Sequence, residues 1–132
     1  MKFMLMMHAP RGTGEYQVSS WKPEALQAHI KFMKDLNKDL RAAGELVAAE
    51  GLAPPGQARI VRSTGEGAPE VTDGPFAESK EFLAGWWIVD VENAERAYAI
   101  AGKASTAPGP SGEPMGLKLE VRQVMSPPPD SM

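Results

Sequence analysis

The sequence predicts a single α+β domain in which two helices cover one face of a β-sheet. Three observations lead to this prediction. The chain has 132 residues, which is the size of one domain. Apolar runs typical of strands alternate with two segments of helical periodicity. Glycine- and proline-rich connections separate these segments, with no internal repeat and no linker long enough to divide two domains.

The first half of the chain predicts a strand, a helix and a second strand. Residues 2–7 are apolar at both alternating sets of positions, which is typical of a strand buried on both faces. Residues 23–43 carry apolar side chains within one arc at helical spacing. Pro23 suits the first turn of this helix, and Gly44 is expected as the C′ residue that ends it. Residues 45–52 predict a strand that its alanines weaken.

The second half predicts a hairpin, a strand, a helix and a final strand. Residues 58–62 and 69–72 are expected to pair, because the connection between them contains two glycines that permit positive φ. Residues 82–91 are apolar on both faces and form the clearest strand. Asn93 is the expected N-cap of a helix over 94–101, which Gly102 would end. Residues 117–125 alternate as an edge strand does, or a strand with one dry face.

The resulting order, β-α-β-(hairpin)-β-α-β, is a ferredoxin-like split βαβ arrangement with an inserted β-hairpin. Because both helices cover one face, the apolar residues on the other face of strands 2–7 and 82–91 need another cover. An apolar patch of this size usually marks an interface, so we expect a homodimer with sheet packed against sheet. A lid formed by the hairpin or by the proline-rich tail, 126–132, is the alternative. The domain itself is expected to span 1–125.

Composition excludes several classes of function. The net charge of −3, without a basic run, argues against nucleic-acid binding. The absence of cysteine removes thiolate nucleophiles and Cys-ligated metals, and two distant histidines predict no metal site. No apolar run approaches the roughly 20 residues of a membrane span, and the N-terminal run is too short for a signal peptide. We therefore expect a cytoplasmic protein without a membrane partner, and we find no motif for an organic cofactor.

A nine-residue motif carries a family resemblance. The run Asp-Gly-Pro-Phe-Ala-Glu-Ser-Lys-Glu at 73–81 resembles the DGPF signature of the YciI-like, or YCII-related, family. Supporting stretches at 1–6, 40–47, 50–54 and 120–122 extend the likeness over nearly the whole chain. The resemblance implies a dimeric α/β-barrel version of the ferredoxin-like fold and no established reaction. In the wider group a His/Asp pair in a cleft suggests enzymatic activity, and some members are encoded beside alternative sigma factors.

His29 and Asp73 are the candidate catalytic residues. His29 lies three residues after Leu26 and four before Met33, so it points into the apolar arc of its helix. With a carboxylate partner it would act as a general acid or base near neutral pH. The alternative is a core histidine bonded to a backbone carbonyl or to water. Asp73 is expected to orient His29, and its alternative role is that of a turn residue in Asp-Gly-Pro.

Four further residues are candidates for substrate binding. Glu78 and Lys80, in a charged run before the clearest strand, are expected to line the same cleft as His29 and Asp73. The alternative is that they are solvated gatekeeper charges.

Arg11 is expected to hold an anionic substrate, and His8 at the end of the first strand is a further candidate for anion binding. Trp86 and Trp87 must point to opposite faces, and Trp86 is the candidate for stacking on a planar ligand. Core packing is the alternative for both tryptophans.

The expected function is cofactor-independent acid–base chemistry by a histidine and an aspartate on a small acidic or aromatic compound in a cleft of the homodimer. Two alternatives stay open. One is a non-catalytic module that binds a small ligand or regulates a transcription-associated partner. The other is a structural dimer without a site.

Overall fold

The computed structural model describes residues 1–11 and 20–125, so the predicted tail at 126–132 lies outside the described residues. In chain order the elements are β1 (Lys2–Pro10), α1 (Pro23–Ala42), β2 (Leu46–Gly51), a 3-10 turn η3 (Pro55–Gln57), β3 (Arg59–Arg62), β4 (Glu70–Asp73), β5 (Glu81–Asp90), α2 (Ala94–Ser105) and β6 (Lys118–Gln123). This order confirms the predicted sequence of strands and helices.

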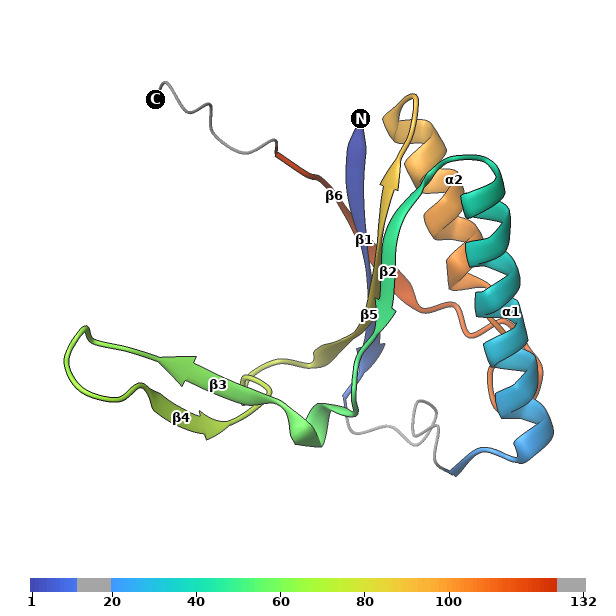
Figure 1. The fold of residues 1–132 in the computed structure, drawn as a ribbon. Helices are drawn as coiled ribbons and strands as arrows, with labels where there is room; N and C mark the ends of the chain where they lie inside the picture. Colours follow the sequence, from blue (N-terminus) through green and yellow to red (C-terminus); the bar gives the residue numbers. More distant parts are fainter. Residues whose placement is uncertain (12–19, 126–132) are drawn as a thin grey trace, which may run out of the picture.

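The main sheet has the strand order β2-β5-β1-β6, and every neighbouring pair is antiparallel. The two helices therefore return the chain to non-neighbouring strands, which is the ferredoxin-like arrangement. β3 and β4 form a separate two-stranded hairpin, as predicted. Figure 1 shows that this hairpin projects from one end of the sheet, on the side opposite the helices.

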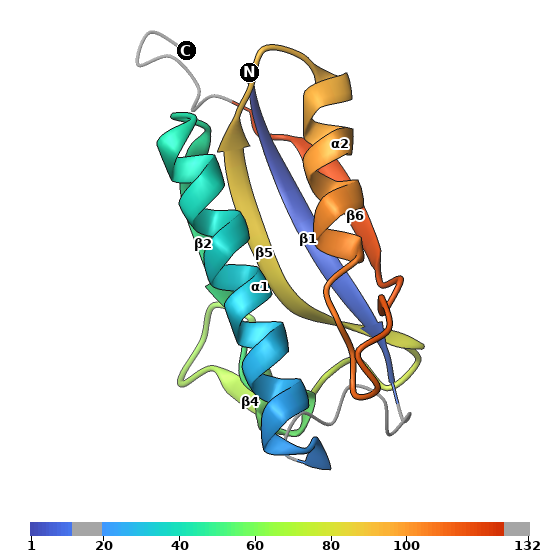
Figure 2. The same cartoon turned by 90° about the vertical axis from the view of Figure 1, so that its right-hand side faces the viewer.

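Both helices pack on the same face of the sheet, and the core lies between these two layers (Figure 2). Alternate residues of the central strands point into it: Phe3, Leu5 and Met7 from β1, and Trp87 and Val89 from β5. The helices contribute Leu36 and Leu40 from α1, with Ala97, Ile100, Ala101 and Ala104 from α2. Burial of these apolar side chains is the main favourable contribution to the stability of the fold.

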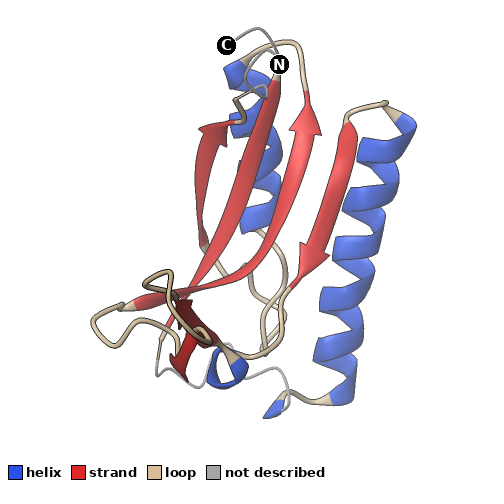
Figure 3. Cartoon of the chain, turned by 60° about the vertical axis from the view of Figure 1, so that its left-hand side comes forward, coloured by secondary structure: helices blue, strands red, loops and turns tan. Residues whose placement is uncertain are grey.

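The opposite face of the sheet, here called the open sheet face, carries the other alternating set of side chains. Met4 and Met6 of β1 lie beside Ile88 and Trp86 of β5 in the strand register, and all four are partly exposed. The projecting hairpin does not lie across this face (Figure 3). The hairpin therefore does not act as the lid that was considered as an alternative cover.

The ends of the two helices agree with the predictions in part. α1 ends as expected, with Gly44 at a positive φ of 72° just beyond it. Asn93 caps α2, because its side chain accepts a hydrogen bond from the Arg96 backbone N–H at 2.9 Å. The prediction that Gly102 ends α2 is wrong, since the helix continues to Ser105. Ile30, one of the apolar residues of the predicted helix over 23–43, is 42% exposed in α1.

Candidate functional site

The structure contains a large surface cavity at the end of the sheet from which the hairpin projects. It has a volume of about 970 Å³, which is within the range of small-molecule sites. We call it the larger cavity. Its walls come from four places: the ends of β1 and β6, the segment between β2 and β3, the loop between β4 and β5, and the start of β5. The lining residues are His8, Leu52, Ala53, Pro54, Pro55, Gln57, Ala58, Pro75, Phe76, Ser79, Lys80, Glu81, Phe82, Leu83, Lys118, Leu119 and Glu120.

Arg11 holds the loop that follows β4 in place. Its Nη1 donates to the backbone carbonyls of Phe76 at 2.8 Å and of Ala77 and Ser79 at 3.4 Å each. Its backbone N–H donates to the Lys80 carbonyl at 2.9 Å. Charge-assisted hydrogen bonds of this kind are stronger than those between neutral groups. Arg11 therefore organises the wall of the larger cavity, and these contacts explain its presence without a ligand.

The start of the same loop is fixed by a close backbone approach. The Gly74 N–H donates to the Ala58 carbonyl at 3.0 Å. A Cβ at Gly74 would lie 3.2 Å from the Ala58 carbonyl carbon, which is tighter than an ordinary contact. Glycine in the Asp-Gly-Pro motif therefore allows the loop to pack against the start of β3.

A histidine and a glutamate form the polar part of the larger cavity. Nε2 of His8 lies 3.4 Å from Oε1 of Glu120, and the two side chains are 29% and 55% exposed. His8 ends up opposite Lys118 in the β1–β6 register, and all three residues line the cavity. A carboxylate beside one ring nitrogen favours a proton on that nitrogen, which leaves the lone pair on the other. This arrangement suits a general acid or base.

His29 lines a second, smaller cavity of about 210 Å³ between α1 and the sheet. The ring is buried and meets Trp21 edge-on, with ring centroids 5.3 Å apart. Its Nδ1 lies 3.0 Å from the carbonyl oxygen of Pro108. Since a carbonyl only accepts, Nδ1 carries the proton and Nε2 keeps the lone pair. No carboxylate among the described residues pairs with His29, so this contact is the backbone bond considered as the alternative.

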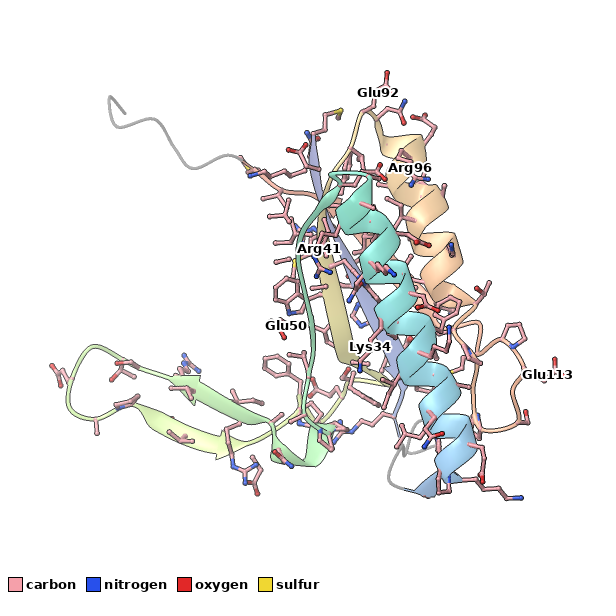
Figure 4. The ribbon with its side chains drawn as sticks, turned by 45° about the vertical axis from the view of Figure 1, so that its right-hand side comes forward. Lys34, Arg41, Glu50, Glu92, Arg96 and Glu113 are labelled. Carbon is pink, nitrogen blue, oxygen red and sulfur yellow. The ribbon has the colours of Figure 1, made fainter. Side chains whose placement is uncertain are left out.

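At the smaller cavity, one part-buried side-chain hydrogen bond joins α1 to the sheet. Nε1 of Trp87 donates to Oδ1 of Asn37 at 2.8 Å. Trp87 is 5% exposed, which makes this bond the polar connection between β5 and α1 at the cavity. At the same place β2 approaches β5 closely, because a Cβ on Gly85 would lie 3.1 Å from the Glu50 carbonyl oxygen. Figure 4 shows Glu50 extending from β2 away from α1.

Within one chain the predicted site residues are not gathered in one cleft. Lys80 lines the larger cavity, whereas His29 and Trp86 line the smaller one. Asp73 lines neither of these two cavities; its side chain is 96% exposed, with Oδ1 3.7 Å from the Arg59 Nε across the hairpin.

Glu78 is also exposed and lines neither cavity. The predicted grouping of Glu78, Lys80 and Asp73 with His29 is therefore not found in the single chain, because the hairpin and its loop stand at the far side of the sheet from α1 (Figure 1).

Sequence reasoning did not identify the two partners of His8. Glu120 and Lys118 lie at the polar positions of an alternating strand, which is an ordinary pattern for a solvated edge. Only the register between the first and last strands brings them to His8. A weaker signal for the His8–Glu120 pair was available in the sequence. Each residue is at a polar strand position, and the ferredoxin-like order makes the first and last strands neighbours.

Over 1–11 and 20–125, no group of three or more histidine, aspartate or glutamate side chains is arranged to hold a metal ion. Neither helix in this part of the chain has the length and apolar character needed to cross a membrane.

The fold and the two histidine-lined cavities define a ferredoxin-like α+β domain with a small-molecule-sized cleft at one end of its sheet. Residues 1–109 match the model of the YCII-related domain, and the chain belongs to this family. An uncharacterized protein of Rhizobium meliloti (strain 1021) is 30% identical over 93 residues, which is 70% of this chain and 74% of that protein.

Proposed function

We propose that the protein is a cofactor-independent enzyme that transfers protons on a small molecule bound in the larger cavity. The observation that carries this proposal is the His8–Glu120 pair, 3.4 Å apart, in the wall of a mainly apolar cavity of about 970 Å³. Apolar walls bind the body of a ligand, and a small number of polar groups fix its orientation. Glu120 lies beside Nε2 of His8, while the second ring nitrogen faces no described partner and is the one that can exchange a proton with a ligand.

The proposed active form is a homodimer of the dimeric α/β-barrel type, packed through the open sheet face. Support comes from the partly exposed row of Met4, Met6, Trp86 and Ile88, which the helices do not cover. The larger cavity opens on the same side of the sheet, because His8, Lys118 and Glu120 belong to that face. A second copy on this face would reduce the access of water to the cavity and strengthen its electrostatic interactions.

The test uses hydrogen exchange on candidate substrates. The protein is incubated in D₂O with a panel of ring-bearing ketones and keto acids, and the loss of the exchangeable C–H signal is followed by NMR. Removal of a general base typically costs about 10²–10⁴-fold in rate. We therefore expect His8→Gln to lower the exchange rate by this factor and Glu120→Gln to lower it less, with the circular dichroism spectra unchanged.

His29→Gln is the matched control, because it alters the other histidine-lined cavity. If His29→Gln abolishes exchange and His8→Gln does not, the proton transfer belongs to the smaller cavity, where the predicted catalytic role of His29 would apply. Retention of full activity in His8→Gln contradicts the proposal.

The alternative is a non-catalytic ligand-binding or regulatory module, favoured by the exposure of Glu120, whose side chain is 55% accessible and open to competition from water. This alternative predicts ligands that bind without any exchange.

A further inference from the structure

The charged groups that line the larger cavity are balanced. Lys80 and Lys118 carry two positive charges and Glu81 and Glu120 two negative ones, so the sum is 2 − 2 = 0 while His8 is neutral. Neither lysine makes an ion pair with another described residue. A neutral ligand therefore enters without a net electrostatic penalty, while two cationic groups remain available to an anion formed inside the cavity.

Lys118 is placed beside the proposed base. It is the direct partner of His8 in the antiparallel β1–β6 register. Side chains at such positions project from the same face with Cβ atoms about 4.5–5.5 Å apart. Glu120 occupies Nε2 of His8, so Nδ1 is the nitrogen that can take a proton. A ligand oxygen beside Nδ1 would therefore lie within reach of the Lys118 ammonium group.

The apolar part of the cavity favours a flat ring. Its walls include the exposed aromatic side chain of Phe76 and the rigid rings of Pro54, Pro55 and Pro75. Flat apolar surfaces of this kind pack well against the faces of a planar ligand. The lining thus has a ring-binding region and, at the open-face ends of β1 and β6, a polar region with a base and a cation.

We propose that the larger cavity binds a neutral, ring-bearing weak oxygen acid, a phenol or a stable enol, and that Lys118 stabilises its anion. The proposal rests on the proton-transfer function argued above. The ligand O–H bond breaks, its electron pair stays on oxygen, and the proton forms a bond to Nδ1 of His8. The lining then carries +1 and the ligand −1, so charge is conserved. Lys80, on the loop held by Arg11, adds a second cation.

The test uses 4-nitrophenol, whose anion absorbs visible light and whose neutral form does not. The probe is buffered well below its own pKa, and the full-length protein is added while binding is measured separately by calorimetry. Wild-type protein should raise the anion absorbance. Lys118→Gln should lower the ratio of bound anion to bound neutral probe by about 5-fold, the upper limit for an exposed ion pair. Lys118→Arg keeps the charge and should restore the anion signal.

Lys34→Gln is the matched control, because Lys34 is an exposed lysine on α1 that lines neither cavity (Figure 4). It should leave the signal unchanged. The inference is overturned if the probe does not bind, if it binds without ionising, or if Lys118→Gln behaves as the wild type does. Ionisation that depends on Lys118, without hydrogen exchange on any ketone, would reject the proposed catalysis and retain this ligand class. Hydrogen exchange that depends on His8 but not on Lys118 would retain the proposed catalysis and reject this ligand class.

Discussion

Met6 tests whether a second copy of the chain covers the open sheet face. Its side chain is partly exposed at the centre of that face, between Trp86 on β5 and Glu120 on β6 in the strand register. Fully burying a methionine side chain is worth roughly 1.5–3 kcal/mol, and Met6 is already partly buried in the single chain, so covering the rest is worth on the order of 1 kcal/mol for each copy. In a two-fold interface each substitution occurs twice, so removing the Met6 side chain costs about 2 kcal/mol of association free energy, or roughly 30-fold in Kd.

Met6→Lys should weaken the dimer by more than this roughly 30-fold, because a lysine ammonium group must also leave water at the interface. The dimer dissociation constant is measured by sedimentation equilibrium over a series of protein concentrations. Ile30→Lys is the matched control, since Ile30 is a 42% exposed apolar residue on the helical side of the molecule. It should leave the dissociation constant unchanged, and thermal melts of both variants report any loss of fold. A wild-type protein that sediments as a monomer at micromolar concentration refutes the reasoning, as does a Met6→Lys dimer of unchanged affinity.

Three other predictions concern stability. Asn37→Ala should lower the free energy of unfolding by about 1–3 kcal/mol, because it leaves the Trp87 N–H without its acceptor. In a double-mutant cycle measured by urea denaturation, the same Asn37→Ala change should cost much less in a Trp87→Phe background. Gly85→Ala should cost about 1–3 kcal/mol, because the added Cβ meets the β2 backbone; an unchanged urea midpoint would show that β2 moves freely. The Arg96 guanidinium donates two hydrogen bonds to the Glu45 carboxylate and so lowers the pKa of Glu45. The stability that this pair contributes is complete above the usual glutamate pKa and is lost as the pH falls through the lowered value. Glu45→Gln should therefore be less stable than wild type by up to about 1 kcal/mol at neutral pH and equal to it in acid, and a difference that persists in acid would contradict this assignment.

The sequence was most informative where a signal is local. The two-sided apolar pattern of residues 2–7 and 82–91 predicted two strands, which the structure places as the central pair β1 and β5. Asn93 predicted the start of α2 through its capping oxygen. The end of α2 was predicted wrongly because glycine was given more weight than periodicity. Ala97, Ile100, Ala101 and Ala104 continue one buried stripe past Gly102, and their packing outweighs the roughly 1 kcal/mol that a glycine costs inside a helix.

The candidate site could be predicted only in part, because its contacts join residues far apart in the chain. His8 and Glu120 meet through a strand register that the sequence does not specify. The expected pairing of His29 with Asp73 assumed that a turn motif and a helix reach the same cleft. His29 instead bonds the Pro108 carbonyl, and Asp73 faces Arg59 on the projecting hairpin. Whether either residue has a catalytic role stays a prediction.

The DGPF segment has a structural role that links the insertion to the larger cavity. Without the inserted hairpin and its loop, the end of the sheet beside His8 would have no wall there. In this chain the loop after β4 supplies one wall, and its position depends on Gly74 against Ala58 at one end and on Arg11 at the other. Loops that carry function are usually held by a rigid scaffold, and here β1 provides it. Since His8 and Arg11 lie at the same end of β1, the strand that presents the proposed base also positions the loop that closes around it.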